Sequence, residues 1–415
     1  MNLRSRRYLS VFSTLAVVVT ITPSLMTSAS TVVPAQAHTT ATTIPMPVFC
    51  KTHTCTVTKV AIPEASAGGY KPVAPAGAND LYRCTYFDPK FLQNQMIVGS
   101  SFVAQNHGTA KKPVIEIHHA ILYQVPPTMK STVSKLGKSW TCFGSPINAN
   151  DVAGLGALPW AAAWAPGATQ SERPAGYGNS VPAGSGFALQ IHYNLLASKA
   201  KDNSYMNIIT TPAATSGLTQ LNGWQIVAPP ELPCPAGSTG KLCDKAASLA
   251  DLATRFGQSA VSFNNLIEWV CQGSANTAGI GSNWHGNTWT SCIWRMGPSV
   301  SSGPITLHAV GAHMHLLGKT LSVVLCHTDR TCANTSQTTA LFVNNYNFDN
   351  QQSYPVAPTV VNQGDYVKIT CTYDPTLRKF NPQTAKLAPR YITWGDGSSD
   401  EMCLSTLSYS VGANT

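Results

Sequence analysis

Two histidines separated by a single residue, His313 and His315, are the side chains of this chain best placed to do chemistry. They lie in the largely apolar run Gly311-Ala312-His313-Met314-His315-Leu316-Leu317-Gly318-Lys319. On a strand, alternate side chains leave the same face, so both imidazoles would point the same way. Two imidazoles on one rigid face form a bidentate metal site. The alternative is a solvent-facing pair that binds nothing.

The first half of the chain has histidines in similar settings. The segment Ile115-Glu116-Ile117-His118-His119-Ala120-Ile121-Leu122-Tyr123 reads as a strand, on which adjacent side chains point to opposite faces. His118 and His119 can therefore share one ion only if the strand twists or ends there, or if the rings use different nitrogens. His192, in Ala188-Leu189-Gln190-Ile191-His192-Tyr193, is by itself more typical of a structural residue. Together, three imidazoles would suit copper.

A candidate third ligand for the second-half pair is Met402, in Ser398-Ser399-Asp400-Glu401-Met402-Cys403. Alone, this methionine would be assigned to the core. A thioether beside two imidazoles is a soft donor set that favours Cu(I) and is poor for zinc. A hydrolytic zinc enzyme would instead need a carboxylate base near its ligands, and Glu401 is the only obvious candidate.

The remaining histidines have weaker claims to a site. His308 lies five residues before His313, so strand parity puts it on the opposite face as a structural residue. Cleavage after Ala37 would make His38 the amino terminus, where its amine and imidazole could bind copper together, but a low-complexity lead-in follows it. Beside the cysteine-bounded loops, we expect three exposed histidines: His53, His285 and His327.

The first 37 residues predict an export signal. Arg4, Arg6 and Arg7 precede a mostly apolar stretch, and the segment ends in Ala35-Gln36-Ala37, which resembles a signal-peptidase site. Ser5-Arg6-Arg7-Tyr8-Leu9 partly matches a twin-arginine signal, so the export route stays open. No later apolar run is long enough to span a bilayer. We therefore expect a secreted or extracytoplasmic mature protein of about 378 residues.

Composition excludes some functions and predicts disulfides. Removing the three arginines of the signal lowers the net charge from +9 to +6. Since only 11% of the residues are charged, this mild excess does not indicate a nucleic-acid-binding protein. All twelve cysteines follow the signal, which favours disulfides in an exported protein. The competing zinc interpretation lacks paired CxxC motifs. Short spacings suggest three local bridges: Cys50–Cys55, Cys234–Cys243 and Cys326–Cys332.

Short β-like runs dominate the rest of the chain, punctuated by Gly, Pro, Asn and Ser. Only Leu249 to Trp269 has a possible helical period, and 31 Gly with 28 Pro favour an all-β protein of sandwiches with long loops. A boundary near residues 212–222 would follow a lead-in and short disulfide loop at 38–75 and separate 76–215 from 216–415. The predicted strand runs are Val114 to Val125, Gly186 to Leu195, Ile305 to Leu325 and Tyr366 to Tyr373.

Four segments, taken in order, resemble the copper type II, ascorbate-dependent monooxygenases, the family of peptidylglycine α-hydroxylating monooxygenase and dopamine β-hydroxylase. They are His118-His119, Gln190-Ile191-His192-Tyr193, His313-Met314-His315-Leu316-Leu317-Gly318-Lys319 and Asp400-Glu401-Met402-Cys403, and the resemblance covers roughly residues 80 to 412. It implies two jelly-roll-like, antiparallel β-sandwich domains, each with one copper ion. The two ions would face each other across an open cleft without a bridge.

The resemblance also implies a role for each ligand set. His118, His119 and His192, in residues 76–215, match the site that stores and passes an electron. His313, His315 and Met402, in residues 216–415, match the site where dioxygen binds and a C–H bond is hydroxylated. Ascorbate or another one-electron donor would supply two electrons per turnover.

Disulfides implied by the resemblance are Cys84–Cys142 and Cys371–Cys403, of which the second would fix the position of Met402. Cys271 and Cys292 then remain and are expected to pair with each other.

Departures from the family concern the substrate. Peptide-amidating members carry a carboxylate-binding arginine where this chain has Gly311, and Leu404 and Thr406 replace an Asn and a Tyr. We therefore expect a secreted copper monooxygenase acting on a small organic molecule, with substrate identity and oligomeric state open. The alternative is a secreted copper-binding or copper-handling protein without hydroxylase activity.

Overall fold

The computed structural model describes residues 44–64, 68–75, 77–104, 117–147, 158–168, 170–195, 201–235, 237–273, 289–381 and 384–412. Contacts divide the chain into Met1–Gln36 and Ala37–Thr415, and every described residue belongs to the second unit. The predicted signal peptide, His38 and His285 lie outside the described residues. The predicted division between 76–215 and 216–415 stays a prediction.

Strands account for 43% of the structure and helices for 17%, so the prediction of an all-β, mainly antiparallel fold is confirmed. The strands before residue 221 form two sheets. The first orders its strands as β1 (Thr56–Ala61), β10 (Tyr205–Pro212), β3 (Gln95–Val103), β8 (Tyr177–Val181) and β11 (Thr219–Gln220), with β7 (Gln170–Glu172) also on β3. The second runs β5 (Ser139–Thr141), β2 (Asp80–Phe87), β9 (Gly186–Asn194), β4 (Ile117–Val125) and β6 (Trp160–Trp164).

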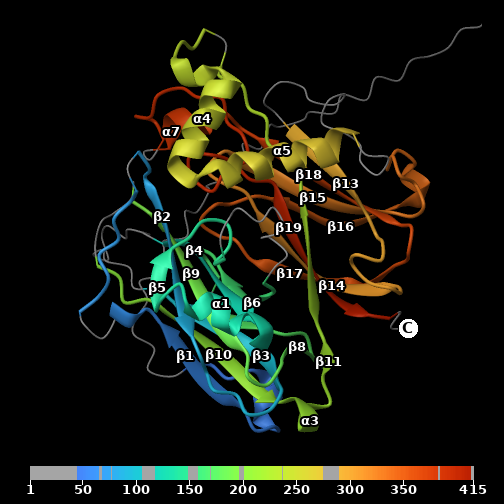
Figure 1. The fold of residues 1–415 in the computed structure, drawn as a ribbon. Helices are drawn as coiled ribbons and strands as arrows, with labels where there is room; N and C mark the ends of the chain where they lie inside the picture. Colours follow the sequence, from blue (N-terminus) through green and yellow to red (C-terminus); the bar gives the residue numbers. More distant parts are fainter. Residues whose placement is uncertain are drawn as a thin grey trace, which may run out of the picture. The chain divides into compact units, whose positions relative to one another are not determined.

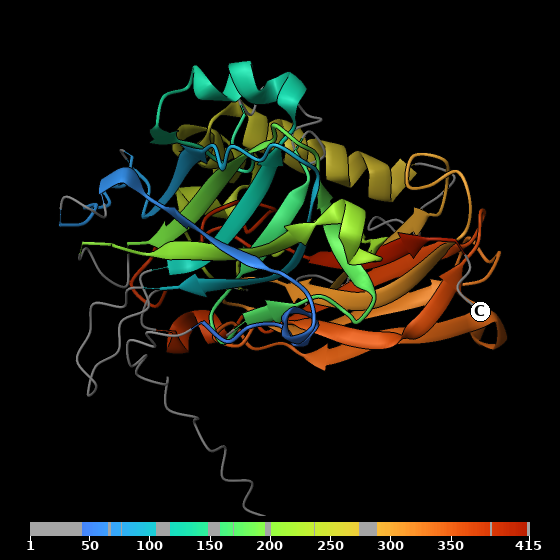
Figure 2. The same ribbon diagram turned by 90° about the horizontal axis from the view of Figure 1, so that it is seen from below.

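The later strands form two further sheets. One orders its strands as β12 (Asn222–Val227), β19 (Leu404–Val411), β14 (Ile305–His313) and β17 (Ser353–Val361). The other runs β13 (Trp289–Arg295), β18 (Tyr366–Tyr373), β15 (Gly318–Cys326) and β16 (Thr338–Asn345). Figures 1 and 2 show the strands before residue 221 in blue to green and the later strands in yellow-green to red.

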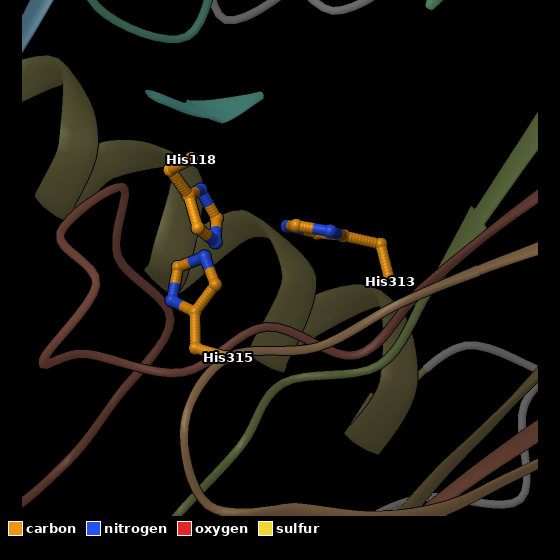
Figure 3. A group of neighbouring side chains, drawn as sticks. All are labelled: His118, His313 and His315. Carbon is orange, nitrogen blue, oxygen red and sulfur yellow. The ribbon is translucent and has the colours of Figure 1, made fainter. Parts of the chain in front are cut away.

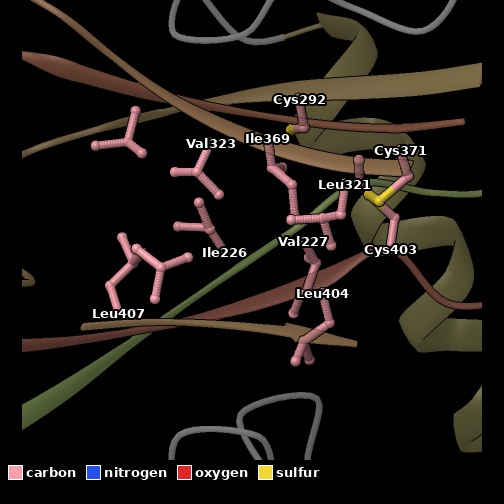
Figure 4. Packing of buried hydrophobic residues seen from close by; sticks show 14 of the residues in the cluster. Ile226, Val227, Cys292, Leu321, Val323, Ile369, Cys371, Cys403, Leu404 and Leu407 are labelled. Carbon is pink, nitrogen blue, oxygen red and sulfur yellow. A yellow bond between two sulfur atoms is a disulfide. The ribbon is translucent and has the colours of Figure 1, made fainter. Parts of the chain in front are cut away.

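Each pair of sheets encloses its own hydrophobic core, as expected for a sandwich. Ile97 of β3 and Leu189 of β9 belong to one buried cluster, which joins the first two sheets. Leu407 of β19 and Ile369 of β18 belong to another, which joins the last two. Figure 4 shows the Cys371–Cys403 disulfide among the side chains of the second core.

Burial explains which strand predictions succeed. β9 is buried along its whole length and β18 alternates buried with half-buried positions, so both match the predicted runs closely. The run from Ile305 to Leu325 was expected as a single stretch, but it contains two strands, β14 and β15, joined by a turn. That turn contains His315, one of the two histidines of the predicted second metal site.

Helices occupy the segment with the predicted helical period, but as two helices in place of one. α4 (Lys245–Phe256) begins where the Asp244 side chain accepts a hydrogen bond from Ala247 N–H at 2.8 Å. It ends at Gly257, whose φ of 88° favours glycine, and α5 (Gln258–Gly273) follows. The remaining helical segments are short: α1 (Lys130–Ser134), α3 (Ala213–Ser216), α7 (Leu377–Phe380), and 3-10 turns at Val48–Lys51, Pro127–Met129, Lys241–Cys243 and Thr335–Gln337.

Six disulfides are present, and they join the pairs expected from the sequence: Cys50–Cys55, Cys84–Cys142, Cys234–Cys243, Cys271–Cys292, Cys326–Cys332 and Cys371–Cys403. No helix within the described ranges combines the length and apolarity needed to cross a membrane.

Candidate metal centre

A β-bulge places two adjacent histidines on one side of β4. Along the pairing with β9, Ile117 lies opposite Tyr193 and His119 lies opposite His192, so His118 is an extra residue without a partner in the ladder. A bulge of this kind re-aims a side chain that strict alternation would send to the other face. Because of the bulge, both side chains can reach one ion, which strict alternation would prevent.

Three Nδ1 atoms converge at this bulge. His118 Nδ1 lies 3.0 Å from His119 Nδ1 and 2.9 Å from His192 Nδ1. Nitrogens that each lie about 2.0 Å from one ion are roughly 3 Å apart, so this spacing suits a shared metal. His192 Nε2 lies 2.9 Å from the Asp80 carboxylate, an acceptor that keeps the ring proton on Nε2 and leaves Nδ1 bare.

The second histidine pair does not lie on one strand, contrary to the expectation. His313 is the last residue of β14, and His315 lies in the turn before β15. Glu401 fixes that turn, because its carboxylate accepts hydrogen bonds from the His315 and Leu317 backbone N–H groups at 2.9 and 2.7 Å. Burial raises the pKa of Glu401 to about 8. Both of its carboxyl oxygens already accept backbone hydrogen bonds, which disfavours the role of hydrolytic base.

Both second-half rings are tethered through Nδ1. His313 Nδ1 lies 2.7 Å from Gln351 Oε1, and His315 Nδ1 lies 3.1 Å from the carbonyl oxygen of Asp400. Each acceptor keeps the ring proton on Nδ1 and leaves Nε2 bare. His315 Nε2 is buried and has no hydrogen-bond partner among the described residues. The first set thus presents Nδ1 atoms, and the second presents Nε2 atoms.

The two histidine sets meet, which corrects the expectation of an open cleft between them. The His118 ring centroid lies 5.6 Å from that of His313 and 5.1 Å from that of His315. Two groups have ligand atoms within 4.8 Å of one another: His118, His119 and His192, and again His118, His313 and His315. Figure 3 shows the three rings of the second group pointing toward one another.

Hydrogen bonds between the halves account for this approach. Asp80 Oδ1, on β2, accepts from the Ser398 hydroxyl at 2.8 Å, and the Tyr82 hydroxyl donates to the Asp396 carbonyl at 2.8 Å. Phe348 stacks on the His118 ring, with centroids 4.8 Å apart. Asp80 therefore contacts both His192 and the loop that leads to Met402.

Burial keeps all five imidazoles neutral. The pKa values of His118, His119 and His192 are well below their usual range, first because of burial and then because of neighbouring imidazoles. Burial lowers the pKa of His313 to about 4 and that of His315 to about 3. Neutral imidazole is the form that binds a metal ion, so the cluster is ready to bind one at neutral pH.

Met402 lies beside this cluster and is 7% exposed. Its carbonyl accepts a hydrogen bond from the Tyr373 hydroxyl at 3.2 Å, and the adjacent Cys403 is bonded to Cys371. Met402 lines the same cavity as His119 and His313. It also belongs to the hydrophobic core, as its residue type alone would suggest, and its assignment as a metal ligand stays a prediction.

An ion-pair cluster positions the residues around Met402. The Arg255 guanidinium, on α4, contacts both Asp400 carboxylate oxygens, at 2.7 and 2.8 Å. Burial alone would raise the pKa of Asp400, but the charge and hydrogen bonds of Arg255, together with the charge of Arg390, hold that pKa below its usual value. Arg390 and Asp251 extend the cluster. Because the Asp400 carbonyl faces His315, this cluster connects α4 to the metal-binding side chains.

A cavity of 1350 Å³ opens onto the histidines, and its walls are rich in aromatic side chains. Among the described residues, the charged groups in its lining are Glu172, Arg173, Arg295 and Asp396. Arg173 is held by hydrogen bonds to Asn179, to Ser171 and to the Ala161 carbonyl. The aromatic lining includes Phe102, Trp164, Trp224, Phe256, Phe263 and Trp394.

The other histidines lie apart from this cluster. His308 contacts the Ser410 hydroxyl at 2.9 Å and the Tyr177 ring, in keeping with a structural role. His53 is exposed as expected, whereas His327 is half-buried and lies 3.3 Å from Asp365.

Several contributors to the centre have no recognisable signal in the sequence. Asp80 and Gln351 lie far along the chain from the histidines that they tether. Asp400 and Glu401 directly precede Met402, so their presence was visible in the sequence. The contact of the Asp400 carbonyl with His315 and the backbone contacts of Glu401 were not.

The later part of the chain is similar to a known protein family. A family model described as copper type II ascorbate-dependent monooxygenase, C-terminal domain, matches residues 282–414. The match identifies residues 282–414 as similar to the C-terminal domain of the copper type II ascorbate-dependent monooxygenases. The matched segment contains His313, His315 and Met402. The description of the family names copper and ascorbate.

The other comparisons give no closer relationship. No curated protein matches the chain. The solved structure of PNGase F, a glycosylasparaginase from Flavobacterium meningosepticum, is 9% identical, with 87% of this chain and 97% of that chain covered and a TM-score of 0.29. A fucolectin from striped bass serum is also 9% identical, over 80% of this chain and 86% of that chain, with a TM-score of 0.18. We draw no conclusion from such low scores.

Proposed function

We propose that this protein is a copper-dependent monooxygenase that hydroxylates a C–H bond of an uncharged, largely apolar organic molecule. His118, His119 and His192 would hold one copper ion, and His313, His315 and Met402 the other. The observation that carries the proposal is the convergence of five buried imidazoles whose protons are kept away from a common centre. We also propose that residues 76–215 and 216–415 act as two domains, each with one ligand set.

The donor atoms fit copper. Imidazole nitrogens bind copper well, and a thioether favours its reduced state over zinc. The buried, unpartnered Nε2 atoms of His118 and His315 would carry a desolvation cost without a ligand. Copper bound at these positions would activate dioxygen with electrons from a one-electron donor such as ascorbate. Asp80, Gln351 and the Asp400 carbonyl would hold the ring protons on the far side of each imidazole.

The cavity supports a substrate with an apolar body. Its aromatic walls would shield the reacting C–H bond from water and bury hydrocarbon surface. The guanidinium of Arg173 already binds three neighbours and is not available to a substrate carboxylate, whereas Arg295, at the end of β13, is an exposed cation of the same lining.

Local structure also opposes peptide amidation through the family's arginine. A Cβ placed on Gly311 would collide with the Thr406 hydroxyl oxygen. An arginine at this position would therefore displace its neighbour on β19, so the two residues differ from the amidating members as a matched pair. The chain cannot hold a peptide carboxylate in the same way.

An extracytoplasmic location is part of the proposal. The six disulfides support it, because such bonds persist in oxidising compartments. The basic, apolar amino-terminal segment is the sequence feature that would direct export.

A matched substrate pair tests the function. The purified protein should bind two copper ions per chain, and ascorbate-driven oxygen uptake should rise when indane is added. Indane-2-carboxylate, which has the same ring system with a charge, should give a much smaller rise. Copper binding with no substrate-dependent uptake across a panel of neutral compounds would instead support a copper-handling protein.

A further inference from the structure

Helix α5 presents an apolar face to the cavity that contains the candidate ligands. Phe263, Leu266 and Val270 line this cavity, and their spacing of three and four residues places them on one face of the helix. All three side chains are half-buried. Apolar residues with this periodicity usually pack into a core, but Leu266 belongs to none of the hydrophobic clusters of the described residues. The face is therefore open to the cavity at its middle.

The adjoining face of α5 is fastened to the later strands. Asn264 Oδ1 accepts a hydrogen bond from the Trp394 backbone N–H at 3.1 Å. Cys271, near the end of the helix, is bonded to Cys292 of β13, and Figure 1 shows α5 beside this strand. A hydrogen bond at one end and a disulfide at the other hold the helix, so its apolar face keeps its direction.

This face runs from the neighbourhood of Met402 toward β13. Phe263 contacts the Trp394 ring, with centroids 5.5 Å apart, and Trp394 forms a β-bridge with the residue directly before Met402. Val270 lies at the far end, next to the disulfide to β13, and Trp294 of that strand lines the same cavity. Because each helical residue rises about 1.5 Å, the stretch from Phe263 to Val270 spans roughly 10 Å.

The size of the cavity leaves room for a molecule of this length. Its volume of 1350 Å³ exceeds the roughly 300–1,000 Å³ of an ordinary small-molecule pocket. Apolar side chains along one wall bury CH₂ groups and demand no polar partner in return.

We propose that α5 forms one wall of a groove for an unbranched hydrocarbon chain of the substrate, with the reacting end near Met402 and the remainder along Phe263, Leu266 and Val270. The inference rests on the proposed function, because it takes the bound molecule to be the substrate, and it adds the chain length that the site accepts. Leu266, in the middle of the face, is the residue that limits this length.

Binding of straight-chain alcohols tests the groove without relying on activity. The alcohols, from n-butanol to n-decanol, compete with the neutral fluorescent probe Nile red for the full chain, with and without copper. We expect the affinity to rise about fourfold for each added methylene group until the groove is filled. The rise should be the same with and without copper, because the wall contains no metal ligand.

Two reciprocal variants assign the effect to the cavity face of α5. Leu266→Trp narrows the groove, so the rise should end at a shorter alcohol, with n-decanol bound roughly tenfold more weakly and n-butanol unchanged. Trp269→Leu is the control, because Trp269 is 66% exposed and is not among the described residues that line the cavity. It should bind the whole series as the unaltered protein does. If Leu266→Trp fails to fold, Leu266→Ser should likewise weaken the binding of n-decanol.

An affinity that does not change with chain length, or an identical series in the Leu266 variant and the unaltered protein, would overturn the groove and leave the monooxygenase proposal intact. A series that responds to Leu266→Trp, with no ascorbate-driven oxygen uptake on any alcohol or neutral compound, would support the groove and overturn the monooxygenase proposal.

Discussion

Asp80 connects His192 to Ser398 through one carboxylate oxygen, which accepts hydrogen bonds from three donor groups. It accepts from His192 Nε2 at 2.9 Å and from both the hydroxyl and the backbone N–H of Ser398, at 2.8 and 3.2 Å. Burial raises its pKa to about 6, and the Ser398 hydrogen bonds act against that rise. A carboxylate behind a ligating imidazole orients the ring and increases its basicity. Asp80 is thus a positioning residue for His192.

Replacing this carboxylate should weaken the first copper site. Asp80→Asn removes the charge behind His192, and changes of this kind cost roughly 10–100-fold in metal affinity. Competition titration with a chromophoric Cu(I) chelator measures the affinity. Asp88→Asn is the matched control, because Asp88 pairs with Lys90 and Lys130 and not with a histidine. Equal copper affinity in both variants would contradict the role given to Asp80.

At the scale of elements, helix α4 stabilises the loop that carries Met402. Arg255 and Asp400 form a buried, bidentate ion pair, with 7% and 5% of their side chains exposed. Such a pair contributes little net stability compared with apolar packing, but removal of one partner leaves a buried charge without compensation. The loop and the helix therefore depend on each other.

Arg255→Ala should lower the free energy of unfolding by roughly 3–5 kcal/mol. Arg390 lies 3.4 Å from Asp400 and can compensate in part, so the lower end of that range is expected. Urea-induced unfolding measures the change. Arg330→Ala, at an exposed arginine, should shift stability by no more than about 0.5 kcal/mol. An equally small effect at Arg255 would show that the ion pair does not hold the loop.

The elements also show how far the sequence could lead. Apolar runs predicted β9 and β18 well because burial on the sheet faces determines them. The bulge at His118 depends on the register with β9, and the end of β14 at His313 depends on the Glu401 contacts to the following turn. Both features arise from partners far along the chain, so local periodicity could not reveal them.

At the scale of the whole chain, the unit from Ala37 to Thr415 brings two histidine sets from different sheets into ring contact. The order of the motifs was enough to predict both histidine sets, but not the distance between them. The Asp80–Ser398 hydrogen bond joins residues 318 positions apart, and nothing in either segment indicates the other. The expectation of an open cleft came from the family resemblance, and the contacts of this chain differ.

A pH effect follows from the acidic groups gathered between the halves. Burial, followed by the charges of Asp400 and Asp80, raises the pKa of Asp396 to about 7, whereas Arg255 acts in the other direction. A folded-state pKa above the unfolded value gives stability that is complete below the unfolded pKa and is lost as the pH rises through about 7. The contribution of Asp396 to the free energy of unfolding should therefore fall between pH 5 and pH 8, and Asp396→Asn should remove that contribution. The buried histidines, whose pKa values are lowered, act in the opposite direction as the pH rises through 6.5, so the test compares the variant with the unaltered protein.

Unfolding in urea at these two pH values provides the test. Asp329→Asn is the control, because this exposed loop carboxyl has its pKa lowered to about 2, outside the pH range compared. The prediction is wrong if Asp396→Asn and Asp329→Asn lose the same stability as the unaltered protein between pH 5 and pH 8.

The central claim is that His313, His315 and Met402 form the site at which a C–H bond is hydroxylated. The most direct measurement is mass spectrometry of the product formed from indane with copper, ascorbate and ¹⁸O-labelled dioxygen. We expect one labelled oxygen atom per product molecule, and near-complete loss of product in Met402→Ile with copper retained at the first site. Met296→Ile, at a fully buried core methionine, should retain product formation. Unlabelled product, or equal activity in Met402→Ile, would contradict the account.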